Sequence, residues 1–355
     1  MSGNEKTMKA VVVTGDNQTA ILDVPRPEAL PGEVLIRIDT CLICTWEQRI
    51  FSGKAGMTLP FLPGHEASGT IAEIPANTVT SFKAGDRVVF KTLDHCGHCS
   101  FCYQGDTNQC SGTFRKRVYG SLAASGGMAE YIALEVSKVL PVRQDLDLVV
   151  AAFAEPLACC LHSIERVELN MGDTVAIIGA GIMGQLHAIL ARLRGCRVLV
   201  VEPDPVRREL ALSLGAHVGI DPSAGDPVEQ VRQLTGGQGV EAVFSTVTKS
   251  AVAGSTVGML RKMGALVLYG SFHPNDPIPT DPNAVHYKEY IITGSYSPST
   301  RDFFRATRLL SHGLVDPSPF ISKTFPMEKA QEAFLASLRP DTYRVAIRID
   351  SLIRR

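Results

Sequence analysis

The chain has 355 residues, of which 45% are hydrophobic and 20% are charged, so it can bury a sizeable core and is not intrinsically disordered. Lys and Arg total 35 against 36 Asp and Glu, and this balance gives no basic excess for binding nucleic acid. No apolar run reaches the ~18–20 residues of a membrane span, and the N-terminus lacks the apolar segment of a secretory signal. We therefore expect a cytoplasmic protein of two domains that binds neither nucleic acid nor membrane.

Short β-type runs broken by glycine and proline fill the first 150 residues. They are KAVVV (9–13), EVLIRI (33–38), ASGTIAEI (67–74), DRVVF (86–90) and AEYIAL (129–134). This density of short strands predicts a compact barrel.

From about Leu148 the pattern changes to strands alternating with helices, which begins with a predicted helix at 151–165. The runs that follow are TVAIIG (174–179), IMGQLHAILARL (182–193), RVLVVE (197–202), PVRRELALSLG (205–215), EAVFST (241–246), VAGSTVGMLR (252–261) and ALVLYG (265–270). The alternation predicts a parallel sheet covered by helices on both faces. The tail carries two amphipathic helical stretches, 301–313 and 327–338, and one strand-like run, 343–349.

A glycine-rich turn stands between the first of these strands and the next helix. It reads Gly179-Ala-Gly181-Ile182-Met183-Gly184. The first glycine permits a tight turn, the second lets the backbone approach a pyrophosphate, and the third allows close packing of helix on strand. This context predicts a dinucleotide site at the helix N-terminus.

The next strand ends at Glu202, eighteen residues after the last glycine. A carboxylate there can accept hydrogen bonds from both ribose hydroxyls and would repel the extra phosphate of NADP, so NAD is favoured over NADP. In the alternative interpretation Glu202 is only a polar strand end. Arg207 and Arg208 follow, and they could accommodate a 2′-phosphate or simply be solvated.

Two further strand ends are candidate cofactor contacts. Thr246 ends the run EAVFST, and Gly270 and Ser271 follow ALVLY. The carboxyl ends of parallel strands are where a nicotinamide would lie, so we expect contacts there, mainly through the backbone.

Four cysteines cluster between the predicted barrel strands. Cys96, Cys99, Cys102 and Cys110 form C-x2-C-x2-C-x7-C, the donor set of a closed tetrahedral zinc site without an open position for substrate. We expect a structural zinc ion there. An iron–sulfur cluster is the main rival, and four free thiols are the other.

A second zinc signal is dispersed along the chain. Cys44 follows a strand-like run, His65 and Glu66 lie in PGHEASG, and Glu155 opens a predicted helix. A thiolate, an imidazole and a carboxylate could bind zinc and leave one position for water or substrate. Taken singly, Cys44 could equally be a small core residue, and His65 could cap a turn.

Together these residues resemble the zinc-dependent medium-chain dehydrogenase/reductase family, especially its polyol (sorbitol-type) and threonine-dehydrogenase-like branches. The resemblance also uses EPL at 155–157 and HYKEYIITGSYS at 286–297, and it covers nearly the whole chain. It implies an α/β protein with a GroES-like β-barrel catalytic domain at 1–150 and 296–355, including a structural zinc lobe at about 92–114. The implied second domain, at 151–295, is a doubly wound parallel-sheet Rossmann domain that binds NAD.

The resemblance also implies roles for individual residues. Cys44, His65 and Glu155 match the metal-binding positions of the polyol branch, and Glu66 matches a carboxylate that can enter the shell of the catalytic zinc. Arg207 would lie near the adenine. The implied chemistry is hydride transfer between a carbinol carbon and NAD(P), with one catalytic and one structural zinc ion per chain.

The chain departs from its relatives after the zinc cysteine. Relatives usually read Cys-Gly-Ser/Thr-Asp-x-His, whereas this chain places Trp46 at the hydroxyl position and Arg49 at the later histidine position. An indole only donates and cannot pass a proton onward. Either Thr45 or a water chain carries the proton and Trp46 shapes the pocket, or Glu66 is the acid/base and Trp46 is an apolar wall against a ring-shaped substrate.

The leading functional hypothesis is a zinc- and NAD-dependent dehydrogenase for a secondary hydroxyl of a polyol, sugar or cyclic alcohol. One alternative is a lyase or epimerase that keeps its nicotinamide and returns the hydride, and another is a non-catalytic relative. We expect a small-molecule alcohol or carbonyl substrate and a homodimer or homotetramer.

Overall fold

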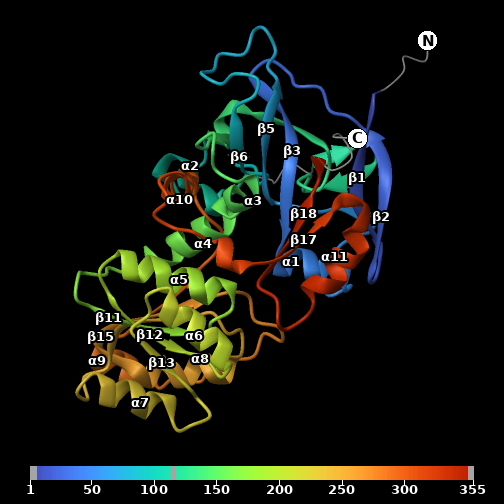
Figure 1. Cartoon of the computed structure of the whole chain (residues 1–355). Helices are drawn as coiled ribbons and strands as arrows, with labels where there is room; N and C mark the ends of the chain where they lie inside the picture. The colour runs from blue at the N-terminus through green and yellow to red at the C-terminus, as the bar shows by residue number, and fades with distance from the viewer. Residues whose placement is uncertain (1–5, 113–116, 351–355) are drawn as a thin grey trace. The chain divides into compact units, whose positions relative to one another are not determined.

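The computed structural model describes residues 6–112 and 117–350, and the chain divides into two compact units (Figure 1). Unit 1 consists of Met1–Ala158 with Ser299–Arg355, and unit 2 of Cys159–Pro298. Residues 113–114, the end of the predicted zinc lobe, lie outside the described residues, as do 1–5 and 351–355 of the predicted barrel. Every helix in the described part of the chain is too short or too polar to cross a membrane.

The described residues of unit 1 form two sheets. One has the strand order β2-β1-β4-β8-β7, and the other has the order β10-β6-β5-β3-β18-β17, with β9 also paired to β3. The strands are β1 (Thr7–Gly15), β2 (Gln18–Pro25), β3 (Glu33–Ile43), β4 (Phe61–Leu62), β5 (Glu66–Glu73), β6 (Arg87–Phe90), β7 (Arg117–Tyr119), β8 (Leu122–Ala124), β9 (Tyr131–Glu135), β10 (Val139–Pro141), β17 (Ile321–Pro326) and β18 (Arg344–Arg348). Because β18 pairs antiparallel with β3, the C-terminal segment completes the sheet begun by the N-terminal one.

The helices of unit 1 are short and lie between or beside these strands. They are α1 (Thr45–Phe51), α2 (Ser100–Gln104), α3 (Leu148–Ala151), α10 (Thr300–Ser311) and α11 (Ala330–Ser337), with 3-10 turns η1 (Thr107–Gln109), η2 (Val136–Lys138), η4 (Ser318–Phe320) and η5 (Met327–Lys329). Helix α4 (Ala154–Ile164) contains the boundary between the units.

One hydrophobic core joins the two sheets of unit 1. Val11 of β1, Ile36 of β3 and Val345 of β18 are completely or almost completely buried in it. The rings of Phe51 in α1 and Phe334 in α11 add to it, with centroids 4.9 Å apart. This packing holds α1 in place, and α1 begins directly after Cys44.

Unit 2 is a six-stranded sheet with the order β13-β12-β11-β14-β15-β16. Every neighbouring pair is parallel, so the predicted parallel sheet is confirmed. The strands are β11 (Thr174–Ile178), β12 (Arg197–Val201), β13 (Val218–Ile220), β14 (Val240–Ser245), β15 (Leu260–Tyr269) and β16 (Ile291–Ser295). The helices are α5 (Ile182–Leu193), α6 (Pro205–Ser213), α7 (Pro227–Leu234), α8 (Ser250–Thr256) and α9 (Pro282–Lys288), with a 3-10 turn η3 (Val257–Met259).

Helices cover both faces of this sheet, as the sequence predicted. Val243 of β14 packs in a core cluster with Val231 of α7, whereas its neighbour Phe244 faces His187 of α5, with ring centroids 5.5 Å apart. The helix predicted over 252–261 is too long, because Leu260 pairs with Val240 and so begins β15.

Candidate functional site

Three potential metal ligands converge in unit 1. Cys44 caps the N-terminus of α1 directly after β3, and His65 and Glu66 stand at the start of β5. Because Leu42 of β3 pairs with Glu66, the residue two positions beyond Leu42 lies beside the turn that precedes β5. Cys44 Sγ lies 3.4 Å from His65 Nε2, and one ligand atom from each of Cys44, His65 and Glu66 lies within 4.8 Å of the other two.

Gly64 makes this convergence possible. Its φ is +103°, and a Cβ there would lie 2.6 Å from the backbone nitrogen of Met128 and 2.7 Å from the carbonyl carbon of Gly127. Any side chain would force these segments apart, so glycine is required for the close approach that sets His65 opposite Cys44.

Glu47, to which the sequence assigned no role, orients the histidine. It is completely buried; its Oε1 accepts from His65 Nδ1–H at 2.7 Å and from the Gly64 N–H at 3.2 Å, and its Oε2 accepts from the Cys44 N–H at 3.3 Å. Burial alone would raise the pKa of Glu47, but the charge and hydrogen bond of His65 lower it. Its position three residues after the helix cap is the sequence signal that could have identified it.

Glu66 is paired with an arginine from the far end of the chain. Arg344 Nε and Nη2 donate to its two carboxylate oxygens at 2.9 and 2.7 Å, and both side chains are buried. Burial raises the pKa of Glu66, and the charge of Arg344 opposes that rise. The bidentate pair places a guanidinium beside the predicted metal ligands, a feature that the sequence did not reveal.

Burial favours a neutral thiol at Cys44 unless a cation is present. Burial first, and then the charge of Glu47, raise the pKa of Cys44 to about 12, while His65 opposes the rise. A divalent cation stabilises a coordinating thiolate outright, so this donor set of thiol, imidazole and carboxylate fits a zinc ion chemically.

The other predicted residues of this site lie nearby with different surroundings. Glu155, on α4, is half-buried, and within the described residues the group of close ligand atoms does not include it. The pKa of Glu66 is raised by burial, lowered by the charge of Arg344, and raised again by the charge of Glu155. Trp46 is 39% exposed, with its backbone N–H donating to Cys44 Sγ at 3.1 Å, and Thr45 is exposed.

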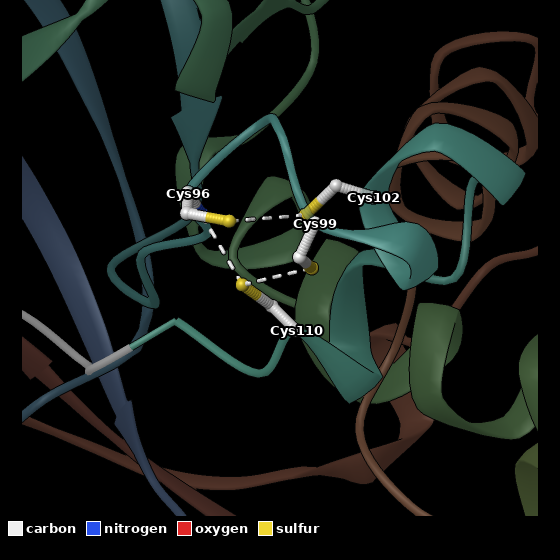
Figure 2. A group of neighbouring side chains, drawn as sticks. All are labelled: Cys96, Cys99, Cys102 and Cys110. Atoms are coloured by element: carbon white, nitrogen blue, oxygen red, sulfur yellow. Dashed lines mark hydrogen bonds between the residues drawn. The ribbon is translucent and has the colours of Figure 1, made fainter.

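The four cysteines of the predicted lobe also come together, with their sulfur atoms turned toward one another (Figure 2). The Sγ atoms of Cys96 and Cys102 are 4.0 Å apart, those of Cys99 and Cys110 are 3.9 Å apart, and all four lie within 4.8 Å of one another. A tetrahedron with zinc–sulfur bonds of about 2.3 Å has edges of about 3.8 Å, so the spacing fits a single zinc ion.

Backbone amides stabilise thiolates in this lobe. The N–H groups of Cys96 and Gly112 each donate to Cys110 Sγ at 3.2 Å, and they lower the pKa of that thiol. A Cβ at Gly112 would lie 2.8 Å from the Cβ of Cys96, so glycine allows the chain to fold back over the cluster.

In unit 2 the glycine turn connects β11 to α5. Gly179 has a φ of +90°, and a Cβ on Gly184 would lie only 1.9 Å from the Gly179 carbonyl oxygen. The cap residue of α5, Gly181, makes no side-chain cap hydrogen bond, whereas Asp204 and Asp226 cap α6 and α7. The N-terminus of α5 therefore follows a glycine turn without a side-chain cap, an arrangement typical of sites that bind an anionic group.

Glu202 lies against this turn. It is buried, and its carboxylate accepts hydrogen bonds from the Ala180 N–H at 2.6 Å and the Asp204 N–H at 3.0 Å. The side-chain amide of Gln185, which the sequence did not single out, donates to the carbonyls of Ala180 at 3.3 Å and Arg207 at 2.9 Å. These contacts join the glycine turn to the start of α6.

The remaining predicted cofactor residues lie on or after the same ends of the parallel strands. Thr246 Oγ1 donates to the Ile178 carbonyl at 2.8 Å. Gly270, with a φ of +121°, and Ser271 are exposed directly after β15. In α5, Ile182 is buried, and the Met183 carbonyl accepts from Nδ1 of His187 at 2.7 Å. Arg207 Nη1 would lie 4.0 Å from a Cβ on Gly181, so its guanidinium is beside the turn.

Comparison with known proteins covers both units. Residues 30–144 match the family model for the alcohol dehydrogenase GroES-like domain, and residues 183–312 match that for zinc-binding dehydrogenase. D-arabitol-phosphate dehydrogenase of Enterococcus avium is 31% identical over 96% of this chain and 97% of its own length. Sorbitol dehydrogenase of Halalkalibacterium halodurans is 29% identical over 96% of this chain and 99% of its own.

A solved structure is similar throughout. A zinc-binding dehydrogenase of Sinorhizobium meliloti, solved with NADP bound, has a TM-score of 0.87 and 28% identity, covering 97% of this chain and 99% of its own. The predicted combination of a GroES-like domain and a Rossmann domain is therefore confirmed. The chain belongs to the zinc-type medium-chain alcohol dehydrogenase family.

Proposed function

We propose that this protein oxidises a secondary hydroxyl of a polyol, sugar or cyclic alcohol to the carbonyl, with NAD as the hydride acceptor. The convergence of Cys44 and His65, 3.4 Å apart and held by Glu47, is the observation that carries the proposal. Relatives named for arabitol phosphate and sorbitol support polyols as the substrate class.

We propose two zinc ions per chain, each in unit 1. Cys44, His65 and Glu155 would hold the catalytic ion, with Glu66 beside it, and the four lobe cysteines would hold the structural ion. Zinc at the first site supplies Lewis acidity that lowers the pKa of a bound alcohol. Four thiolates are typical of a closed, structural zinc site, whereas three protein ligands are typical of a catalytic one that would remain open to the alcohol substrate.

The buried carboxylates have separate roles in this proposal. Glu47 accepts the Nδ1 proton of His65 and so leaves Nε2 for the metal. Both oxygens of Glu66 already accept from Arg344, which favours Thr45 or a water chain over Glu66 as the proton route. Trp46 would then only shape the pocket, since an indole does not accept a proton.

We propose NAD rather than NADP as the cofactor. Glu202 uses one lone pair on each oxygen for the amides of Ala180 and Asp204, so others remain for the ribose hydroxyls. Its charge would repel a 2′-phosphate. Nucleotide phosphates would lie at the N-terminus of α5, and Thr246, Gly270 and Ser271 would border the nicotinamide.

We propose that the protein forms a homodimer through β16. In the sheet formed by the described residues β16 has one neighbour, β15, and its Ile291 is 55% exposed. An apolar edge strand favours pairing with a second chain, and an antiparallel copy would extend the sheet. Light scattering during size-exclusion chromatography should give twice the chain mass, and Ile291→Lys should lower the measured mass. A monomeric wild-type protein would contradict the proposal.

The cytoplasmic location stays a prediction.

The function is tested by following nicotinamide absorbance while the zinc-loaded protein meets linear polyols, polyol phosphates, cyclic polyols and amino alcohols. We expect NADH to form with at least one polyol, and Cys44→Ser to abolish turnover while the lobe keeps its zinc. Cys159→Ala, a cysteine of α4, is the matched control and should remain active. Substrate isomerisation or elimination without net NADH would instead establish the hydride-returning alternative.

A further inference from the structure

Arg208 ties the ends of two neighbouring strands together. It lies on α6, which packs beside β12 and β13 (Figure 1). Its Nη1 donates to the carbonyls of Glu202 at 2.6 Å and Pro203 at 2.7 Å, and its Nη2 lies 3.1 Å from Oδ2 of Asp221. One guanidinium therefore bridges the turn after β12 and the residue after β13.

The carboxylate partner of this bridge is itself fixed. Asp221 Oδ1 accepts from the Ser223 N–H at 2.8 Å and from its hydroxyl at 2.6 Å. The hydrogen bonds from Ser223, and then the charge of Arg208, lower the pKa of Asp221. The Glu202 N–H also donates to the Ile220 carbonyl at 3.0 Å, so the two strand ends are joined at both backbone and side chain.

These contacts hold the backbone of the residue proposed to bind the ribose. Arg208 fixes the carbonyls of Glu202 and Pro203, while the Ala180 and Asp204 amides fix the Glu202 carboxylate. The Arg208 guanidinium is thus already engaged by three acceptors in the structure. This engagement favours a positioning role over the 2′-phosphate role considered from the sequence.

We propose that Arg208 is a positioning residue for nucleotide selection, which holds the 202–203 turn so that Glu202 accepts from the ribose and excludes a 2′-phosphate. The inference rests on the proposed use of NAD. Without the bridge, the 202–203 turn can move away from β13. The Glu202 carboxylate is then no longer aligned to accept from the ribose of NAD, and its charge no longer lies where the 2′-phosphate of NADP would be. The chemistry of catalysis, carried out by residues of unit 1, should not depend on it.

The test compares Arg208→Leu with Arg232→Leu in the zinc-loaded, full-length protein. Arg232 is a matched control because it also donates to two carbonyls, those of Gly258 and Gly237, both at 3.0 Å. Those glycines precede β15 and β14, at the opposite end of the parallel strands from Glu202. Calorimetric titration with NAD and with NADP gives the affinities, and steady-state kinetics separates KM from kcat.

For Arg208→Leu we expect NAD to bind about tenfold more weakly, since the loss of a charged hydrogen bond is worth roughly tenfold in affinity. The affinity for NADP should change by less than about threefold. The kcat at saturating NAD should stay within about twofold of wild type. Arg232→Leu should leave the ratio of NAD to NADP affinity unchanged. Asp221→Asn, which keeps Arg208 but weakens its anchor, should shift the ratio in the same direction by a smaller factor.

Other outcomes would overturn the inference. Selective loss of NADP binding in Arg208→Leu would make Arg208 a phosphate ligand. Equal weakening of NAD and NADP binding in Arg208→Leu would make it a structural residue. An equal shift of the affinity ratio in Arg232→Leu would have the same meaning. If Arg208→Leu does not fold, an unchanged ratio in Asp221→Asn would overturn it. If the wild-type protein does not prefer NAD, the proposed cofactor is overturned together with this inference. If the wild-type protein prefers NAD but the ratio of NAD to NADP affinity is unchanged in Arg208→Leu and Asp221→Asn, only this inference is overturned.

Discussion

His65 donates its Nδ1–H to Oε1 of Glu47 across 2.7 Å, and the same carboxylate accepts the backbone N–H of Cys44 through Oε2. The start of α1 and the orientation of the imidazole therefore depend on one buried side chain. Cys44 and His65 lie twenty-one positions apart in the chain, and hydrogen bonds to Glu47 hold both in place.

Glu47→Gln should weaken zinc binding at the proposed catalytic site. The amide keeps the size of the side chain but removes the charge that stabilises the histidine proton, and loss of such a partner lowers metal affinity by about 10–100-fold. Chelator competition followed by elemental analysis should show loss of one of the two proposed zinc ions at a chelator concentration that wild type tolerates. Glu332→Gln, an exposed change in α11, is the control, and equal zinc retention in both variants would contradict the prediction.

Cys110→Ser should remove the structural zinc and loosen the lobe. A hydroxyl is a poor replacement for a thiolate that accepts two backbone N–H bonds, so the remaining three cysteines would lose the ion. Elemental analysis should find one zinc fewer, and hydrogen exchange should accelerate in residues 95–112. Cys159→Ala should change neither quantity, and a fully loaded, slowly exchanging Cys110→Ser protein would refute the assignment.

Arg344→Met should destabilise unit 1 strongly. Removing the guanidinium leaves the buried Glu66 without its bidentate partner, and breaking such a pair typically costs about 3–5 kcal/mol. Urea unfolding should therefore shift to a lower midpoint. The double variant Glu66→Gln with Arg344→Met should recover part of the loss, because the unpaired charge is gone; additive losses would argue against a direct pair.

Glu66→Gln alone separates the two proton-route hypotheses. If Glu66 is the acid/base, turnover should fall and its pH profile should change while zinc stays bound. The ion pair with Arg344 leads us to expect retained zinc and an unaltered pH profile instead. Trp46→Ser tests the apolar wall against a ring-shaped substrate that accompanies the Glu66 hypothesis, and an unchanged preference between cyclic and linear polyols would refute that wall.

His187 should make the stability of unit 2 depend on pH. Burial lowers its pKa to about 4, so the native state holds it neutral while the unfolded state takes up a proton below the ordinary value near 6.5. The contribution of the neutral, buried His187 to the free energy of unfolding is therefore complete above pH 6.5. Roughly 3 kcal/mol of this free energy is lost as the pH falls toward 4. Urea unfolding of His187→Gln across this range should be less steep in pH than wild type, whereas His286→Gln, an exposed control in α9, should match wild type.

Short spacings along the chain were sufficient to indicate the cysteine lobe, the glycine turn and the parallel sheet. Cys96 to Cys110 and Gly179 to Gly184 each lie in a single local segment, so the backbone brings them together without reference to the rest of the fold. Alternation of apolar strands and helices predicted the layers of unit 2 for the same reason. The ends of elements were less accurate, as at Leu260, because strand pairing overrode the helical pattern.

The surroundings of the predicted zinc ligands depend on long-range packing. Arg344 meets Glu66 across 278 positions, and Arg208 reaches the residue after a separate strand, so no local pattern announces either contact. Buried charges take whichever partner the folded core brings within hydrogen-bond distance, because leaving them unpaired is costly. Residue types and spacing can therefore name a metal or nucleotide site, but the packed strands determine which charges orient its ligands.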